Sequence, residues 1–246
     1  MTPIDLERAT SFGSRAEDYA RWRPTYPAAA VDWVLPSHAS RVAEVGAGTG
    51  ALTGSLIGRG LQVDAVEPDA RMLEVLMRLH PKATGHLAGA ESLPLPDASV
   101  DAVLAADAWH WFPFEQSVKE VRRVLRPGGW LGLLWNVVTP VAPWEEELAA
   151  LDPDYRPTPD TGEIGEGPFP AQETETATFP WVWHTTPDDW CSYLGTLSIF
   201  MLMDEAQRAD RLEAAHAILT AVCTKTGLPT APVQHEVFCV RWRPQP

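Results

Sequence analysis

Three glycines and a later glutamate are the residues of this sequence best suited to hold a nucleoside. Gly46, Gly48 and Gly50 lie in the segment EVGAGTG. Glycine has no Cβ and tolerates positive φ, so ligand atoms can lie directly against the backbone of such a turn. Glu67 follows Gly46 at a separation of about 20 residues, where a carboxylate can accept both hydroxyls of a ribose. A plain tight turn followed by a solvated acid is the alternative interpretation.

The elements around these residues favour the nucleoside site. The short apolar run Arg41–Val45 predicts a buried strand, the segment from Thr49 predicts a helix, and Gln62–Val66 predicts a second strand that ends at Glu67. The glycines then fall at a strand-to-helix turn, where the start of the helix supplies unpaired N–H groups. Ala51 also satisfies the G-x-G-x-x-A form of the dinucleotide motif, so the turn alone leaves a nicotinamide cofactor open.

Further motifs resemble those of the class I S-adenosylmethionine (SAM)-dependent methyltransferases, more narrowly the small-molecule, methyltransferase type 11 branch with its trans-aconitate methyltransferase-like proteins. The matching segments follow the family order over roughly the first 135 residues: Phe12–Pro27, Glu44–Gly50, Val66–Leu73, Ala90–Val103, Ala108–Phe112, Val124–Gly129 and Leu133–Asn136. The resemblance implies SAM as cofactor and S-adenosylhomocysteine as product. It also implies a Rossmann-like α/β fold: a seven-stranded, mostly parallel sheet with an antiparallel last strand, helices on both faces and a helical lid insertion.

The resemblance further implies which residues bind the cofactor. In this sequence they are Tyr19, Arg23, Tyr26, Glu44, Gly46, Ala47, Gly48, Glu67, Pro68, Met72, Ala90, Glu91, Ala106 and Trp109. Backbone at Ala90 is expected to meet the adenine, whereas Glu91 either contacts the adenine or is only a structural acid, because Gly89 stands where many relatives carry a polar residue. A guanidinium pairs bidentately with a carboxylate. Arg23 is therefore a candidate clamp for the methionine carboxylate or for an acidic acceptor, unless it is a helix-surface arginine.

His110 and Asp107 are the candidate general bases of the predicted reaction. An imidazole has an unperturbed pKa of about 6.5 and can take a proton near neutrality; otherwise AWHWF is a packing motif. A carboxylate or phenolate acceptor needs little or no base, because the methyl group is already activated by the positive sulfur, so a missing triad does not argue against an enzyme. Val137 to Thr139 stand where relatives often carry an Arg-Asp pair, which favours a less polar acceptor.

The composition of the chain limits the classes of partner that it can bind. The chain has 33 acidic and 19 basic residues and a formal net charge of −14, which argues against binding of nucleic acid phosphates. No run of about 18 apolar residues predicts a membrane span, and the charged start MTPIDLERAT favours a cytoplasmic protein.

The three cysteines predict neither a disulfide framework nor a metal site, because Cys191, Cys223 and Cys239 are too scattered along the chain. We therefore expect a small-molecule acceptor, no metal, and a monomer or homodimer.

Alternating strand and helix patterns predict a parallel sheet covered on both faces within a single domain. The expected helices are Phe12–Arg21, Ala28–Leu35, Thr49–Arg59, Ala70–Leu79, Phe114–Leu125, Pro187–Met203 and Asp204–Thr226. The expected strands are Arg41–Val45, Gln62–Val66, Thr84–Ala88, Val100–Ala106, Trp130–Trp135, Ala177–His184 and Gln234–Trp242. Residues 126–129 (RPGG) are expected to form the turn into the fifth strand.

The expected organisation has four parts: cofactor-covering helices (1–36), a SAM-binding core (37–135), a lid and acceptor region (136–232) and the last strand (233–246). Asn136–Thr176 is rich in proline, glycine and acids and predicts a long loop, either a mobile lid or disordered. Several tryptophans are expected near the pocket: Trp22, Trp109, Trp111, Trp135, Trp144, Trp181, Trp183 and Trp190. A SAM-using enzyme that transfers no methyl group, such as one that cyclises SAM, and a noncatalytic SAM-binding protein remain alternatives.

Overall fold

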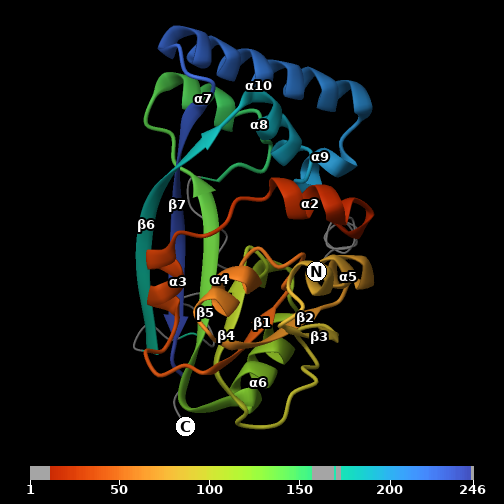
Figure 1. Cartoon of the computed structure of the whole chain (residues 1–246), viewed down its shortest axis with the longest axis vertical. Helices are drawn as coiled ribbons and strands as arrows, with labels where there is room; N and C mark the ends of the chain where they lie inside the picture. Colours follow the sequence, from red (N-terminus) through yellow and green to blue (C-terminus); the bar gives the residue numbers. More distant parts are fainter. Residues whose placement is uncertain (1–11, 157–168, 170–172, 245–246) are drawn as a thin grey trace.

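A seven-stranded sheet forms the centre of the computed structural model, which describes residues 12–156, 169 and 173–244 (Figure 1). The strands are β1 (Arg41–Val45), β2 (Gln62–Glu67), β3 (Thr84–Leu87), β4 (Val100–Ala106), β5 (Leu125–Val138), β6 (Thr174–Thr185) and β7 (Ala231–Trp242). Their order across the sheet is β3-β2-β1-β4-β5-β7-β6. The pairings among β1 to β5 are parallel, whereas β7 runs antiparallel to both β5 and β6. The predicted mostly parallel sheet with an antiparallel last strand is confirmed.

Helices cover the two faces of this sheet and one of its ends. They are η1 (Phe12–Arg15), α2 (Ala16–Trp22), α3 (Ala28–Val34), α4 (Thr53–Gly58), α5 (Ala70–Leu79), η2 (Trp109–Trp111), α6 (Phe114–Val124), α7 (Pro143–Ala149), α8 (Pro187–Leu194), α9 (Ser198–Leu202) and α10 (Glu205–Thr226). Apolar residues of α3, α4 and α5 pack on one face, and those of α6 pack on the other. No helix among the described residues is long and apolar enough to cross a bilayer.

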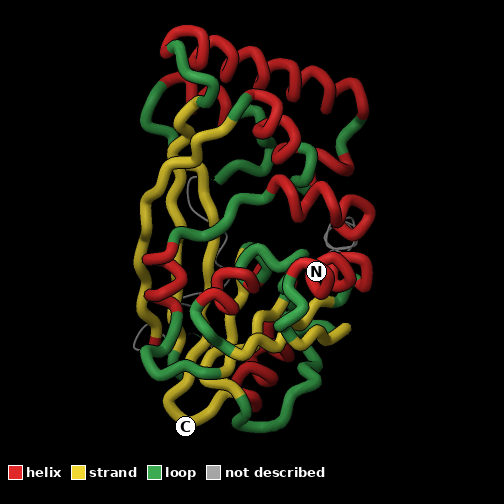
Figure 2. The backbone as a smooth tube through the Cα atoms, viewed as in Figure 1, coloured by secondary structure: helices red, strands yellow, loops and turns green. Residues whose placement is uncertain are grey.

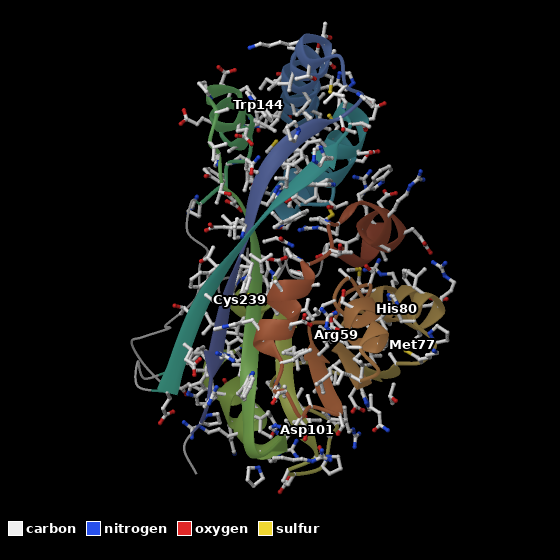
Figure 3. The ribbon with its side chains drawn as sticks, turned by 60° about the vertical axis from the view of Figure 1, so that its left-hand side comes forward. Arg59, Met77, His80, Asp101, Trp144 and Cys239 are labelled. Carbon is white, nitrogen blue, oxygen red and sulfur yellow. The ribbon has the colours of Figure 1, made fainter. Side chains whose placement is uncertain are left out.

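Helices α7 to α10 gather at one end of the molecule, and we call them the cap (Figures 1 and 2). Trp144 of α7 lies at this end, and Asp101, near the start of β4, lies at the opposite end (Figure 3). Parallel strands β1 to β5 therefore point their carboxyl ends toward the cap, which is where ligands bind in open α/β sheets. The α2 helix lies between the cap and α5 in the same view, and it contacts both α8 and α5.

Five predicted elements differ in type or continuity from the observed ones. The helix predicted over Phe12–Arg21 is the 3-10 helix η1 followed by α2. The helix predicted from Thr49 begins at Thr53, because Gly50 has a φ of +95° that no right-handed helix accommodates. The predicted turn RPGG lies inside the span of β5, where the pairing with β4 shifts register. One predicted helix is two: α8 ends at Leu194, with Gly195 as its C-cap, and α9 begins at Ser198.

The fifth difference is the segment Asn136–Thr176, for which the prediction of a single long loop is wrong. It contains the end of β5, helix α7 and the start of β6. Pro143 stands at the first turn of α7, and the buried carboxylate of Glu145 accepts hydrogen bonds from the backbone N–H groups of Val141 (2.9 Å) and Gln234 (2.8 Å). These bonds fix α7 against β7. Most of the proline-rich part, residues 157–168, lies outside the described residues, so the lid prediction applies to a part of the chain that the structure does not describe.

The two edge strands of the sheet differ in length. β3 has four residues, whereas β6 has twelve and pairs along its whole length with β7. Pro180 stands in the middle of β6, opposite Glu236, and the pairing continues on both sides of it. A proline has no N–H to donate, so within a sheet it is tolerated at an edge where the missing N–H faces away from the partner strand.

Candidate cofactor and acceptor site

The glycine turn leaves β1 at the cap end of the sheet and has little room for side chains. Gly46 has a φ of +68° and Gly48 a φ of +58°, a region that other residues rarely adopt. A Cβ on Gly46 would lie 2.7 Å from the Cβ of Ala108. The N–H groups of Gly46 and Ala47 both donate to the carbonyl of Val66, at 2.9 and 3.1 Å. The turn is thus tied to the end of β2, and Gly46, Ala47 and Gly48 line the cavity beside it.

Glu67 ends β2 directly beside this turn. One carboxylate oxygen accepts the N–H of Gly48 at 2.9 Å, and the other accepts the N–H of Asp69 at 2.9 Å. The side chain is almost buried, with 8% of the residue exposed, and this burial raises the pKa of Glu67 above its ordinary value. A carboxylate has about four lone-pair positions, so each oxygen keeps a position for a ribose hydroxyl while it holds the backbone.

Glu44 is a second buried acid and lies one residue before the end of β1. Only 2% of the residue is exposed, and one carboxylate oxygen accepts the hydroxyl of Thr53 at 2.5 Å. Burial, reinforced by the nearby Glu67, raises the pKa of Glu44 to about 8. No salt bridge joins Glu44 to a basic residue within the described ranges. A cation that entered the cavity beside it would therefore meet an acid whose ionised form it could stabilise.

Arg23 brings a positive charge from the N-terminal segment to the same place. Its guanidinium carbon lies 4.5 Å from the ring centroid of Tyr19 and 5.6 Å from that of Tyr193. One terminal N–H group donates to the carbonyl of Thr196 at 3.1 Å, just as Arg15 donates to the carbonyl of Gly195 at 3.1 Å. The Nε of Arg23 is buried and has no hydrogen-bond partner among the described residues. Arg23 is thus held by the cap but keeps one donor for a ligand.

Asp107 follows β4 and holds three segments together. It has a φ of +50°, a strained value for a residue with a Cβ. One carboxylate oxygen accepts the hydroxyl of Tyr26 at 2.7 Å and the other accepts the N–H of Asn136 at 3.0 Å. Burial raises the pKa of Asp107, although the Tyr26 bond and Arg23 oppose this effect. Through these two bonds Asp107 positions the N-terminal segment against the end of β5.

His110 lies at the wall of the same space. It belongs to η2, is exposed, and its ring centroid is 4.7 Å from that of Trp111. Both residues line the cavity. An exposed imidazole at this position can reach a ligand without any movement of the core.

One cavity of about 610 Å³ joins these groups to the cap. Such a volume lies within the range of about 300–1,000 Å³ that is typical of small-molecule sites. The sequence-predicted residues in its wall are Tyr19, Arg23, Tyr26, Glu44, Gly46, Ala47, Gly48, Ala106, Asp107 and His110. Further wall residues come from the end of β5 and from the cap side: Trp135, Asn136, Val137, Val138, Asp152, Asp154, Tyr155, Arg156, Tyr193, Leu197, Ser198 and Ile199.

Six predicted cofactor residues lie outside this wall. Glu67 contacts the turn by accepting the N–H of Gly48, and the side chain of Met72 lies next to Gly48. Pro68 is exposed, Ala90 is buried among core residues, and Trp109 packs in the core against Phe112 and Phe114. Glu91 is exposed, and its carboxylate folds over Gly89 into the space that a side chain at position 89 would occupy. Of the eight tryptophans expected near the pocket, Trp111 and Trp135 line the cavity.

Tyr193, the α9 residues, Asp152 and residues 154–156 are among the wall residues that the sequence patterns did not single out. They lie in the second half of the chain, which carries no recognisable motif, and Tyr193 and the α9 residues reach the cavity because α8 and α9 lie in the cap, beyond the carboxyl ends of the parallel strands (Figure 1). Asn136 ends a recognised segment, but its place in the wall follows from the extension of β5 to Val138. Nothing in the local sequence signals either role.

Comparison with known proteins identifies the family. A methyltransferase domain model matches residues 43–133. An uncharacterized methyltransferase of Mycobacterium tuberculosis is 38% identical over 245 residues, which cover 98% of each chain. The chain belongs to the class I methyltransferases. A solved structure from Anaeromyxobacter dehalogenans, named as a candidate type II methyltransferase, superposes with a TM-score of 0.67 at 29% identity and covers 89% of this chain and 96% of that one.

A more distant structure shares only the fold. The phosphoethanolamine N-methyltransferase 2 of Haemonchus contortus has a TM-score of 0.54 at 15% identity and covers 100% of this chain and 61% of that chain. That protein was solved in complex with S-adenosylhomocysteine and phosphomonomethylethanolamine. Membership of the family implies that this methyltransferase uses SAM. Groups of His, Cys, Asp and Glu suited to hold a metal ion are absent from the residues that the structure describes.

Proposed function

We propose that this methyltransferase binds SAM between the glycine turn and the N-terminal segment, and transfers its methyl group to a small molecule held on the cap side of the same cavity. The observation that carries the proposal is the single cavity itself. One half of its wall is made by the turn residues with Tyr19, Arg23 and Tyr26, and the other half by the end of β5 and the cap. One space therefore offers adjoining positions for a cofactor and an acceptor.

The residues of the first half fit the charges of SAM. The buried, unpartnered Nε of Arg23 is a donor suited to the methionine carboxylate. Glu44 is an acid without a basic partner, suited to the positive charge of the same ligand. Gly46 and Gly48 leave backbone open to the ribose, and Glu67 keeps lone pairs for its hydroxyls. Ala90 and Glu91 complete the proposed site at the adenine end.

The chemistry supplied by bound SAM is a methyl group activated by a positively charged sulfur. The protein then has to align the attacking atom with that methyl group and exclude water. We assign Asp107 to positioning, because its two oxygens hold Tyr26 and Asn136. His110 is the proposed base for an acceptor that has to lose a proton.

Within this proposal the chain is a single methyltransferase domain. Residues 1–36 cover the cofactor, 37–135 bind it, 136–232 form the acceptor side and 233–246 complete the sheet. The apolar wall at Val137 and Val138 supports an acceptor less polar than a polycarboxylate.

Calorimetry tests the cofactor half of the proposal. S-adenosylhomocysteine is expected to bind more tightly than NAD, and Arg23→Lys is expected to weaken its binding by about tenfold, because lysine has no Nε donor beside its charge. Arg21→Lys is the matched control, since Arg21 is exposed on the neighbouring turn. Tighter binding of NAD, or equal effects of the two variants, would contradict the proposal.

Incubation with SAM and a metabolite extract tests the transfer. Accumulation of S-adenosylhomocysteine together with a methylated product is the expected result. Binding of SAM without S-adenosylhomocysteine formation would instead favour a SAM-using enzyme that transfers no methyl group, and absence of SAM binding would favour a noncatalytic protein.

A further inference from the structure

The cap-side half of the cavity contains hydrogen-bond donors that have no acceptor. The hydroxyl of Tyr193 makes no hydrogen bond within the described part of the chain. Asn136 accepts the indole N–H of Trp181 through Oδ1 at 3.2 Å, which fixes the orientation of its amide, and its buried Nδ2 has no partner among the described residues. The Nε1 of Trp135 is likewise buried and unpartnered. Buried donors usually have partners, so the Asn136 and Trp135 groups call for an oxygen supplied by something else, and the half-buried Tyr193 offers its hydroxyl in the same wall.

Tyr193 stands where the two halves of the cavity meet. Its ring is packed edge-on against Trp183 and tilted against Trp190, with centroid distances of 5.2 Å in both cases. Arg23 and Asp107 act electrostatically on Tyr193 from the cofactor half, and Asp152 does so from the cap half. Burial raises the pKa of Tyr193 to about 12. At neutral pH its oxygen therefore carries a proton and can donate it in a hydrogen bond.

The charges in the wall disfavour an anionic acceptor. The lining acids are Glu44, Asp107, Asp152 and Asp154, whereas the lining arginines are Arg23 and Arg156, with His110 as the imidazole. Acids outnumber arginines even when Glu44 carries a proton, and Arg23 already faces Asp107. A carboxylate acceptor would thus add an anion to a wall in which acids already outnumber arginines, with Arg23 facing Asp107 and Arg156 exposed and donating to the carbonyl of Tyr155.

The remaining wall of the cap side is apolar. Val137 and Val138 at the end of β5 face the cavity together with Leu197 and Ile199 from the cap. Apolar surface of this kind binds hydrocarbon or aromatic groups and gains free energy from the water it loses. A polar group on the ligand is therefore accommodated where the donors lie and not against these side chains.

We propose that the acceptor of this methyltransferase is a neutral, largely apolar molecule that presents a carbonyl oxygen to Tyr193 and Asn136. The inference rests on the proposed function, since the acceptor binds beside the cofactor. It assigns two residues to substrate specificity: Tyr193 of α8 donates through its hydroxyl, and Asn136 donates through its amide N–H. An ammonium group has no lone pair and would leave both donors without an acceptor, and a carboxylate would meet the acidic wall.

Three probes that share a phenol ring test this charge preference. They are para-hydroxyacetophenone, para-hydroxybenzoate and para-hydroxybenzylamine, which carry a ketone, a carboxylate and an ammonium group. Each is titrated into protein saturated with S-adenosylhomocysteine. The ketone is expected to bind at least about tenfold more tightly than the other two, because it alone satisfies the donors without adding charge. Equal or tighter binding of the carboxylate or the amine, or binding of none of the three, would overturn the proposal.

Variants then test the two residues. Tyr193→Phe is expected to weaken ketone binding by about three- to tenfold, the loss of one hydrogen bond, without a change in S-adenosylhomocysteine binding. Ser192→Ala is the control, because it removes a hydroxyl from the same helix that bonds the carbonyl of Asp188 instead. Asn136→Asp keeps the oxygen that faces Trp181 but replaces the donor by a negative charge, so the preference should move from the ketone to the amine.

The same titrations separate the two proposals. If the protein fails to bind S-adenosylhomocysteine at all, the proposed function falls and the acceptor assignment falls with it. If S-adenosylhomocysteine binds but Tyr193→Phe and Ser192→Ala affect the ketone equally, only the acceptor assignment is overturned.

Discussion

Replacement of Glu44 by glutamine should change how the stability of this methyltransferase depends on pH. The carboxyl group is buried beside Glu67, and its pKa is about 8 in the folded protein against an ordinary value of 4.5. A group whose pKa is raised on folding contributes stability that is complete below its unfolded pKa and is lost as pH rises through the folded value. The affected window therefore runs from about pH 4.5 to about pH 8. The full difference corresponds to about 5 kcal/mol.

Glutamine keeps an oxygen that can accept the hydroxyl of Thr53 but has no proton to lose. Urea unfolding at pH 5 and pH 9 would measure the effect. We expect the free energy of unfolding of the variant to rise relative to that of the native protein between these pH values, by up to about 5 kcal/mol. A difference between the two proteins that is the same at both pH values would refute the reasoning, because it would show that Glu44 does not titrate in this window.

Three further predictions concern the turn, the ribose contact and the cap. Glu67→Ala should lower the affinity for SAM by more than about tenfold in calorimetry, because it removes the carboxylate that holds Gly48 and faces the ribose; unchanged affinity would place the ribose elsewhere. Gly46→Ala should lower both the melting temperature and SAM affinity, since its Cβ would lie 2.7 Å from that of Ala108; native values of both would contradict the strained turn. Burial lowers the pKa of His235 to about 4, so the native protein should lose about 3 kcal/mol of stability as pH falls from about 6.5 to 4. His235→Phe should abolish this loss in urea unfolding, and an identical acid loss in both proteins would contradict it.

The elements that the sequence predicted well are those whose pattern is local. Strands β1, β2 and β4 are short apolar runs, and α5 begins after Asp69, whose side chain accepts two backbone N–H groups of its first turn. Helix α7 has local start signals, with Pro143 in its first turn and Glu145 accepting the N–H groups of Val141 and Ala142, but it lies in a segment whose proline, glycine and acid content predicted a loop.

The residues of the candidate site also fall into those that a local motif predicts and those that only the fold places. The glycine turn and Arg23 were predictable because a motif fixes their spacing. Tyr193 was not, since it reaches the cavity only through the fold of the cap. The prediction that several tryptophans lie near the pocket was wrong for most of them, for a related reason. Trp181, Trp183 and Trp190 instead surround the buried His235, with ring centroids 4.9, 5.9 and 6.0 Å from its ring. Composition predicts that such rings are buried, but not on which side of a sheet they pack.

The two edges of the sheet also bear on how copies of the protein meet each other in a crowded solution. An exposed edge strand offers a row of backbone donors and acceptors that another chain can extend. At one edge β3 provides only four residues, and at the other Pro180 interrupts the outward row of donors in the middle of β6. Neither edge is a good template for strand addition. Contacts between copies of this methyltransferase should therefore use helices and side chains rather than a continuous sheet, and the long β6 can stay at the surface without promoting aggregation.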